Sequence, residues 1–376
     1  MDKAFFILLI VFSVFFGCQS SDAIEEKIAT SSVNLSYAKK FRIKKTNDAT
    51  ILELLGDKSN ARVTATFVLY KNQKPAYVKD AYYIKIPVKK VASMSSIYTT
   101  MLFKLKSEQS VVAIDNADYY TNPFILNKVQ SHEIVELSKA SGINLEKTLI
   151  LNPDLLFTFG MGNPKSDVDE KLMITGIPVA ISIDHLEETP LARAEWIKFF
   201  ACFFDKEKLA DSLFRQTEKR YIQLKSLTHQ VINKPKVLTE IKYGDAWYIP
   251  SSKSYVAHLI NDAGGDYFWK DDAKSGSTPL SFEIVYTKAK DCDVWLNLYN
   301  INSKKDLKSF DERYELFKAY QKNQLYNNNK IQNAFGYSNY WETGMINPDD
   351  VLADLIAIFW PDKLPNHQFT YYKKIE

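Results

Sequence analysis

Signatures of catalysis, cofactor binding and metal binding are scarce in this sequence. It contains no nucleophile elbow, no phosphate-binding loop and no Cys-x-x-Cys pair. The segment Gly160–Lys165 lacks the third glycine of a dinucleotide-binding loop, and in His132–Glu136 a glutamate replaces the second histidine of a zinc-protease helix. We therefore expect no catalytic residue, no metal site and no cofactor, and the protein is not expected to be an enzyme.

Thiols and unbalanced charge are scarce as well. Cys202 lies in an apolar run that is expected to be helical, and Cys292 lies just before an expected strand. Both are predicted to be free and buried, although an exported protein would permit a disulfide between them. The 48 Lys and Arg residues nearly balance the 45 Asp and Glu residues, and no basic cluster is present. This charge pattern argues against nucleic acid as a partner.

The N-terminal segment has the layout of an export signal. Lys3 precedes a 13-residue, almost entirely apolar run, Ala4–Phe16, which is too short to span a bilayer. No second hydrophobic run is long enough to cross a membrane. The run ends at Cys18 in a pattern that resembles the lipobox of bacterial lipoproteins, so residues 1–17 are expected to be cleaved and Cys18 lipidated. The alternative is an ordinary signal peptide with an incidental cysteine.

Lipidation would place the protein outside the cytoplasmic membrane as a membrane-anchored lipoprotein. The inner membrane, the outer membrane and the cell surface are all compatible with such an anchor. Residues 18–34 are mostly small, polar or acidic and are expected to form a flexible tether. The remaining chain is longer than one hydrophobic core usually serves, so two domains are expected.

Two series of alternating strands and helices predict two α/β lobes, at residues 35–187 and 231–376. The first series has expected strands at Thr64–Tyr70, Tyr82–Val91, Val111–Ile114, Leu155–Phe159 and Val179–Ile183, and expected helices at Ile97–Leu105, His132–Lys139 and Asp169–Ile174. The second has expected strands at Val237–Ile241 and Val294–Leu298, and expected helices at Tyr255–Asp262, Phe282–Lys288 and Pro348–Phe359. Asn347 is expected to cap the last helix, with Pro348 in its first turn.

A helical connector, residues 188–230, separates the two series. Apolar residues recur at three- and four-residue spacing from Ala210 to Leu224, while the opposite face is charged. This pattern predicts one long helix over Lys206–Leu227, capped by Asp205 and about 33 Å long. A rigid helix between the lobes would allow only limited opening and closing.

A short pattern occurs once in each expected lobe. Glu146 opens a helix that leads through Asp154 into an apolar strand, and Glu283 does the same before Asp293. The repetition on either side of the connector suggests two lobes of related design.

These segments resemble the class III periplasmic binding proteins of ABC importers for ferric siderophores, haem and cobalamin. The resemblance lies in Asn144–Thr148 with Asn152–Leu156 in the first lobe, Leu280–Val285 in the second, and three further segments, Glu188–Lys198, Asp262–Tyr267 and Tyr340–Gly344, that are typical of a lipoprotein branch of Bacteroidetes. It covers most of the chain from about Ser95 onward. It implies an α/β fold of two Rossmann-like lobes joined by a single long helix, a monomer, and an ABC permease with its ATPase as partners.

The resemblance assigns docking roles to two glutamates. In this family one exposed glutamate on each lobe meets arginine pockets of the permease, and by motif these are Glu146 and Glu283. Two carboxylates held far apart on rigid lobes would fix orientation on a two-fold partner. Taken alone, either glutamate is equally explained by the preference of acidic residues for helix N-termini.

A ligand is expected in the cleft between the lobes, where loops at strand ends converge. The candidates to bind it are Ser96, Tyr98, Tyr119, Trp247, Tyr248 and Trp341. Aromatic rings suit flat, partly apolar ligands, although each of these rings is equally compatible with a place in the core.

The family favours an iron chelate, a ferric siderophore or haem, with cobalamin as the alternative. Anionic siderophores are usually held by several arginines, and after Ile232 the only arginine is Arg313. This scarcity favours a neutral or weakly charged chelate, or cobalamin. A second alternative is a surface lipoprotein that passes a chelate to an outer-membrane receptor. A third is a chelatase, which would need a histidine–glutamate pair in the cleft, with His185 or His258 as the histidine.

Overall fold

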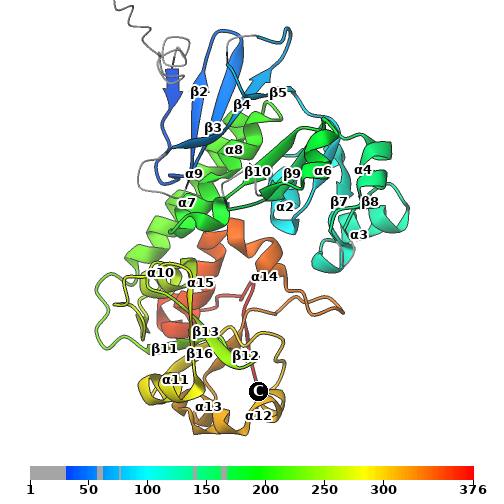
Figure 1. Cartoon of the computed structure of the whole chain (residues 1–376). Helices are drawn as coiled ribbons and strands as arrows, with labels where there is room; N and C mark the ends of the chain where they lie inside the picture. The colour runs from blue at the N-terminus through cyan, green and yellow to red at the C-terminus, as the bar shows by residue number, and fades with distance from the viewer. Residues whose placement is uncertain (1–30, 57–61, 76–77, 139–141, 162–166) are drawn as a thin grey trace, which may run out of the picture.

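The chain folds into two α/β lobes with a helical connector between them (Figure 1). The computed structural model describes residues 31–56, 62–75, 78–138, 142–161 and 167–376. The predicted signal peptide, the lipidation site Cys18 and most of the predicted tether lie outside the described residues. Within the described ranges, no helix combines the length and apolar character needed to cross a membrane.

The first lobe contains a parallel five-stranded sheet, in which β7, β9 and β10 correspond to predicted strands. Its order is β10 (Val179–Ser182), β9 (Leu155–Phe159), β6 (Val91–Ser93), β7 (Val111–Ile114) and β8 (Val135–Glu136). Numbered by chain order and read from the β8 edge, this is 3-2-1-4-5, the first five strands of the Rossmann order. Its helices are α2 (Ser96–Lys104), α3 (Pro123–Gln130), α4 (Leu145–Leu151) and α6 (Glu170–Ile174).

The helix expected at His132–Lys139 is wrong. Helix α3 ends before it, and His132 takes a left-handed conformation with φ of 62°. Val135 and Glu136 then extend and pair with β7 at the edge of the sheet. The polar spacing of this segment is therefore that of a turn followed by an edge strand.

The second lobe contains a sheet in the order β14 (Asp266–Tyr267), β11 (Lys236–Thr239), β16 (Val294–Leu296), β17 (Leu325–Asn327) and β18 (Lys373–Lys374), with only β18 antiparallel. Its helices are α10 (Tyr255–Asp262), α11 (Phe282–Ala289), α12 (Lys304–Phe310), α13 (Lys318–Gln321), α14 (Asn339–Glu342) and α15 (Pro348–Phe359). A small antiparallel sheet, β12 (Lys242–Tyr243), β13 (Ala246–Pro250) and β15 (Ser277–Leu280), lies beside it.

Short 3-10 helices join these elements. They are η1 (Glu108–Ser110), η2 (Ala117–Tyr119), η3 (Asp184–Leu186), η4 (Glu312–Leu316), η5 (Gly344–Ile346) and η6 (Pro361–Lys363).

The two parallel sheets share a design, which the repeated glutamate–aspartate pattern predicts. Four strands correspond in order, β7-β6-β9-β10 in the first lobe and β14-β11-β16-β17 in the second. Asp154 donates its N–H to the carbonyl of Lys90 and accepts the N–H of Lys90, at 2.8 and 2.9 Å. Asp293 makes the same exchange with Lys236, at 2.8 Å in both directions. Each aspartate thus fixes the register of the central strand pair.

The connector consists of α7 (Pro190–Glu195), α8 (Ile197–Cys202) and α9 (Glu207–Ser226). The long helix α9 contributes Ala210 and Phe214 to the core of the first lobe and Tyr221 and Leu224 to the core of the second. One stripe of a single helix therefore belongs to both cores, as the periodicity predicts. The expected cap is wrong, because Lys206 holds the cap position and Asp205 instead pairs with Lys71 at 2.7 Å.

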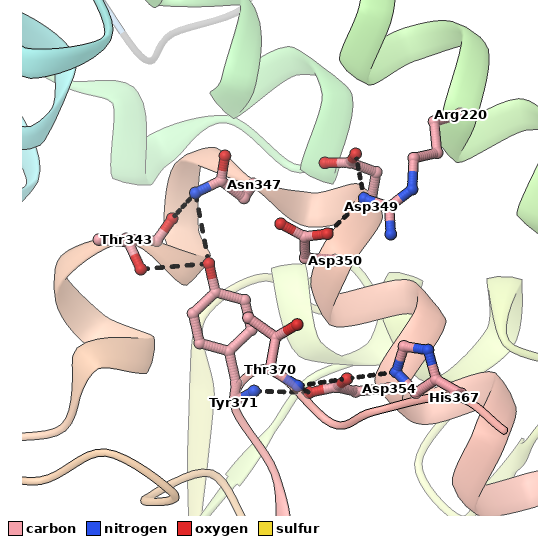
Figure 2. A network of polar contacts seen from close by, with 9 residues as sticks. All are labelled: Arg220, Thr343, Asn347, Asp349, Asp350, Asp354, His367, Thr370 and Tyr371. Carbon is pink, nitrogen blue, oxygen red and sulfur yellow. Dashed lines mark hydrogen bonds and ion pairs between the residues drawn. The ribbon is translucent and has the colours of Figure 1, made fainter.

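The start of the last helix is fastened to the connector (Figure 2). Arg220 of α9 pairs with Asp349, at 2.8 Å, and with Asp350, both in the first turn of α15. Asn347 holds the cap position of α15, but its side chain makes no capping bond and donates to the carbonyl of Thr343 at 2.8 Å instead. The position of the cap is therefore as predicted, whereas its bonding is not.

Further along α15, Asp354 is fully buried and ties the C-terminal segment to the helix (Figure 2). It accepts backbone N–H bonds from Thr370 at 2.9 Å and Tyr371 at 2.7 Å, and it lies 2.7 Å from Nε2 of His367. These contacts hold the C-terminal segment against the last helix of the second lobe.

A separate sheet at the N-terminus was not expected. It comprises β1 (Ser31–Val33), β2 (Phe41–Lys45), β3 (Ala49–Leu55), β4 (Val63–Tyr70) and β5 (Tyr82–Lys85), with β5 parallel to β4 and the other pairs antiparallel. The run Tyr82–Val91 is thus divided between two sheets, and the predicted tether ends in β1. Phe41 and Phe67 pack against Phe199 of α8, which joins this sheet to the first lobe.

Both cysteines in the described residues are buried and free, as predicted. Burial raises the pKa of each thiol, that of Cys292 to about 12, so both stay protonated and unreactive.

Candidate functional site

A cavity of about 540 Å³ lies between the two lobes. Residues that directly follow or end the parallel strands line it: Met94 after β6, Asp115 after β7, Phe159 at the end of β9, Glu240 after β11, Asn297 after β16 and Asn328 after β17. The carboxyl ends of both sheets therefore converge on one space, which is where ligands bind in open α/β sheets.

Exposed aromatic rings surround this cavity. They come from both lobes and are 38% to 66% exposed: Tyr119, Phe159, Tyr299, Phe335, Tyr337 and Trp341. A group of exposed apolar side chains at one cavity indicates a binding surface, whereas single exposed rings are common on any protein. Such rings offer large contact areas at a small cost in conformational entropy.

Carboxamides form most of the polar lining on the second lobe. They are Asn297, Asn300, Asn328, Asn329 and Gln332. The Nδ2 of Asn297 donates to Oγ1 of Thr239 at 3.0 Å and to Oε1 of Glu240 at 3.2 Å, while its Oδ1 accepts from Tyr372 at 2.8 Å. This network holds Asn297 and Glu240 at the cavity wall.

Among the described residues, three charged side chains line the cavity: Asp115, Arg193 and Glu240. Burial raises the pKa of Asp115 to about 6, although the hydroxyl of Tyr120 donates to it at 3.0 Å. Burial also raises the pKa of Glu240 to about 7. Both carboxylates thus lose part of their charge near neutral pH.

The backbone of the second lobe is unusual at this cavity. Glu240, Asn297 and Tyr299 all take left-handed conformations, with φ of 65°, 57° and 54°, and all three line the cavity. Non-glycine residues held in this region cost on the order of 1–3 kcal/mol each and cluster at functional sites.

The lobes contact each other beside the cavity. Asn333 donates to the carbonyls of Asp118 and Tyr120 at 2.7 and 3.1 Å, and the buried Glu342 accepts the N–H of Thr121 at 2.7 Å. The rings of Tyr119 and Tyr337 also meet across the lobes, with their centroids 4.7 Å apart. The structure is therefore a closed arrangement of the two lobes.

Three of the six predicted ligand-binding residues line the cavity: Ser96, Tyr119 and Trp341. Their contact with a ligand stays a prediction. Tyr98 is buried and packs its ring against Phe200. Trp247 is fully buried in the core of the second lobe, and Tyr248, on the opposite face of the same strand, is 48% exposed but does not line the cavity.

The sequence reasoning missed most of the lining. Arg193, Asp115, Glu240 and the carboxamides are not among the predicted ligand-binding residues. Asp115 comes directly after the predicted strand Val111–Ile114, so its position was a signal. Glu240 lies within the predicted strand Val237–Ile241 and follows a strand only in the structure, where β11 ends at Thr239. Neither His185 nor His258 lines the cavity, so the chelatase hypothesis loses the histidine on which it depended.

Glu146 and Glu283 lie at equivalent places on the two lobes. Each is the second residue of its helix, α4 or α11, behind a capping side chain, Asn144 or Ser281, and each is exposed. Glu283 lies 3.3 Å from Arg313 and keeps 72% of its side chain exposed. Each glutamate is therefore exposed at the start of a helix, as docking on a partner would require.

The chain thus has a cavity between two α/β lobes that a long helix joins. The sequence profile described as periplasmic binding protein matches residues 91–330, so the chain belongs to the periplasmic binding protein family. Its structural neighbours are class III members that serve ABC transporters, and they include proteins described as binding iron, heme and vitamin B12.

Individual relatives agree with this membership. An uncharacterized lipoprotein of Methanocaldococcus jannaschii is 26% identical over 300 residues, which cover 77% of this chain and 70% of the relative. A vitamin B12-binding protein of Vibrio campbellii is 26% identical over 57% of this chain and 73% of its own. The structure of a possible iron-binding protein from Staphylococcus epidermidis has a TM-score of 0.56 at 15% identity and covers 73% of this chain and 99% of its own, which supports the fold.

Proposed function

We propose that this protein is the substrate-binding lipoprotein of an ABC importer, which captures an iron chelate, a ferric siderophore or haem, between its lobes and delivers it to the permease. The observation that carries the proposal is the cavity of about 540 Å³ with aromatic rings from both lobes around it. A chelate with flat or apolar ligand groups would fill this space and contact both lobes at once.

Cobalamin is the second candidate, and the charge of the cavity favours it. The one arginine in the described lining, Arg193, already pairs with Asp184 at 2.9 Å. The match to one relative spans 73% of that relative's length, and this relative is named a vitamin B12-binding protein. A corrinoid would use the rings without requiring a cluster of arginines.

Anchoring and delivery complete the proposal. Cys18 would carry the lipid anchor, and Glu146 and Glu283 would dock the loaded protein on the permease. A surface lipoprotein that passes its ligand to an outer-membrane receptor would use the same cavity but not these two glutamates. The anchor and the membrane that carries it are tested by labelling the protein with a fatty acid analogue and fractionating the membranes.

Replacing Trp341 with alanine should weaken ligand binding at least about tenfold, because tryptophans that line a binding cavity are typical hot spots. Tyr248→Ala is the matched control, since Tyr248 and Trp341 are 48% and 49% exposed but only Trp341 lines the cavity. The measurement is calorimetric titration with ferric siderophores, haemin and cyanocobalamin. Equal effects of the two substitutions, or no binding of any compound, would argue against the proposed function.

A further inference from the structure

We propose that the cavity selects ligands without net negative charge, namely neutral or cationic metal chelates and corrinoids that present amide or similar neutral hydrogen-bonding groups. This inference rests on the proposed function, since it names the class of compound that the cavity would accept. It is carried by the charges of the lining and by two buried amide atoms without partners.

The first observation is that Arg193, the one arginine in the described lining, already forms an ion pair within the protein. Nε of Arg193 lies 2.9 Å from Oδ2 of Asp184, whose side chain is only 2% exposed. The guanidinium also lies over the ring of Tyr255, 5.6 Å from its centroid. An anionic ligand would have to compete with a buried carboxylate for this cation, which would leave that carboxylate unpaired.

The second observation is that both lobes contribute a carboxylate. Asp115 comes from the first lobe and Glu240 from the second, and neither forms an ion pair with another described residue. Their partners are neutral donors: Tyr120 for Asp115, and Asn297 and Thr239 for Glu240. Unpaired carboxylates in a partly buried space repel anions and attract cations more strongly than they would in water.

The third observation concerns two adjacent asparagines. Asn328 and Asn329 line the cavity and are only 4% and 1% exposed, yet Nδ2 of Asn328 and Oδ1 of Asn329 have no hydrogen-bond partner among the described residues. The orientation of Asn329 is fixed because its Nδ2 donates to Ile301 at 3.3 Å and to Asn302 at 3.1 Å. Buried polar atoms are rarely left unpaired.

A neutral amide would satisfy both orphan atoms. The hydrogen-bond donor of a ligand amide can bind Oδ1 of Asn329, and its carbonyl oxygen can accept from Nδ2 of Asn328. A carboxylate offers acceptors only, so it would leave Oδ1 of Asn329 unpaired and add repulsion from Asp115 and Glu240. The same arrangement therefore favours amides and disfavours anions.

The two carboxylates should also make binding of a cation depend on pH. Glu136 adds a third negative charge near Asp115. The other ionisable groups that face the pair are tyrosines whose pKa burial raises, so they stay neutral: Tyr120, Tyr267, Tyr340 and Tyr372. Arg193, which lies 2.9 Å from Asp184, is the one basic side chain in the described lining. As pH rises through the raised pKa values of Asp115 and Glu240, the cavity gains negative charge and should bind a cation more tightly.

The test compares ligands of different charge on the full-length chain, purified in detergent and titrated by calorimetry. The probes are ferrioxamine B, which is cationic, ferrichrome and cyanocobalamin, which are neutral and carry amides, and ferric enterobactin, which is strongly anionic. At least one cationic or neutral probe should bind about tenfold more tightly than ferric enterobactin. Tightest binding of the anion would overturn the inference and leave the proposed function intact, whereas no binding of any probe would overturn both.

Two variants locate the effect in the cavity. Asp115→Asn with Glu240→Gln should reduce the affinity for ferrioxamine B about tenfold more than that for cyanocobalamin. Asn328→Ala with Asn329→Ala should weaken the amide-bearing corrinoid about tenfold. The control, Asp245→Asn with Glu312→Gln, makes the same charge change at exposed positions away from the cavity and should preserve the ranking. Equal loss for all probes in the carboxylate variant would overturn the inference.

The pH dependence of the unmodified protein gives a readout that needs no variant. Affinity for ferrioxamine B should rise several-fold between about pH 5 and about pH 8, while affinity for cyanocobalamin stays within about twofold. A flat profile for the cation would overturn the role of the two carboxylates.

Discussion

Reversing the charges of Glu146 and Glu283 together is expected to abolish ligand uptake while ligand affinity stays within about twofold. Both side chains are exposed and neither lines the cavity. If the glutamates enter arginine pockets of the permease, each reversal replaces an attraction with a repulsion. Truncating one partner of a close interfacial charge pair typically costs about 2–5 kcal/mol. Two reversals should therefore weaken docking by several orders of magnitude.

The single variants should differ from each other. Glu283 already lies 3.3 Å from Arg313, so Glu283→Lys also places two cations side by side on the free protein. Glu146 forms no ion pair with another described residue, so Glu146→Lys should not place two cations side by side. Exposed pairs of this kind contribute little, about 0–1 kcal/mol, so both single variants should remain folded.

Uptake of labelled ligand by cells and stimulation of the ATPase in reconstituted vesicles are the measurements. The matched control is Glu170→Lys with Glu312→Lys, which makes the same charge change at two other exposed helix-start positions, one on each lobe. Normal uptake by the Glu146 and Glu283 variant would reject docking through these residues. It would favour transfer to an outer-membrane receptor, for which the glutamates have no role.

The framework of the fold could be predicted because its signals are local. The apolar stripe of α9 predicts a helix with one buried face, and the structure shows that this face is shared by two cores. The repeated glutamate–aspartate unit predicts related lobes, and the backbone exchanges of Asp154 with Lys90 and of Asp293 with Lys236 show the physical basis. Strand ends and helix caps are set by residues a few positions apart, so sequence spacing carries them.

The N-terminal sheet could not be predicted in the same way, because its pairing is long-range. Strand β4 is as rich in β-branched and aromatic residues as β7 and β9 of the parallel sheet, and the sequence does not show which sheet it joins. The N-terminal segment is held by contacts far away in the chain. The fully buried Glu195 accepts N–H bonds from Ser36, Tyr37 and Ala38 at 2.8–3.0 Å.

The cavity could be predicted only in part for a related reason. From sequence alone, an aromatic residue in a strand can belong to the core or to a cleft. In β13, successive side chains point to opposite faces, so one ring is buried and its neighbour is exposed. Trp247 and Tyr248 are neighbours on this strand and point to opposite faces. Which face meets the core depends on α11, α13 and β16, which lie later in the chain. The position directly after a predicted strand was the stronger signal for Asp115, which follows Val111–Ile114. It would not have selected Glu240, because the predicted strand Val237–Ile241 extends past the observed end of β11 at Thr239.

Trp247→Ala is expected to lower the free energy of unfolding of the second lobe by about 3–5 kcal/mol, the usual cost of removing a buried large aromatic side chain. The ring of Trp247 stacks on Trp295 with centroids 5.7 Å apart and meets the edge of Tyr314, also at 5.7 Å. Its Nε1 donates to the carbonyl of Thr239 at 3.2 Å, so the substitution also leaves a buried acceptor unpaired.

Binding should respond to Trp247→Ala much less than stability does. Thr239 adjoins Glu240 at the cavity wall, so the substitution can shift the wall slightly, but Trp247 itself makes no contribution to the lining. At a temperature where the variant is folded, its ligand affinity should stay within a few-fold of the unmodified protein.

Trp341→Ala should show the reverse. Its ligand affinity should be lost while its free energy of unfolding changes by no more than about 1 kcal/mol, because an exposed ring leaves no internal cavity when it is removed. Urea denaturation followed by circular dichroism, with titrations on the same samples, measures both quantities. A large loss of affinity with unchanged stability in Trp247→Ala would instead indicate that Trp247 contacts the ligand. It would contradict a cavity wall formed by Glu240, Asn297 and Asn328.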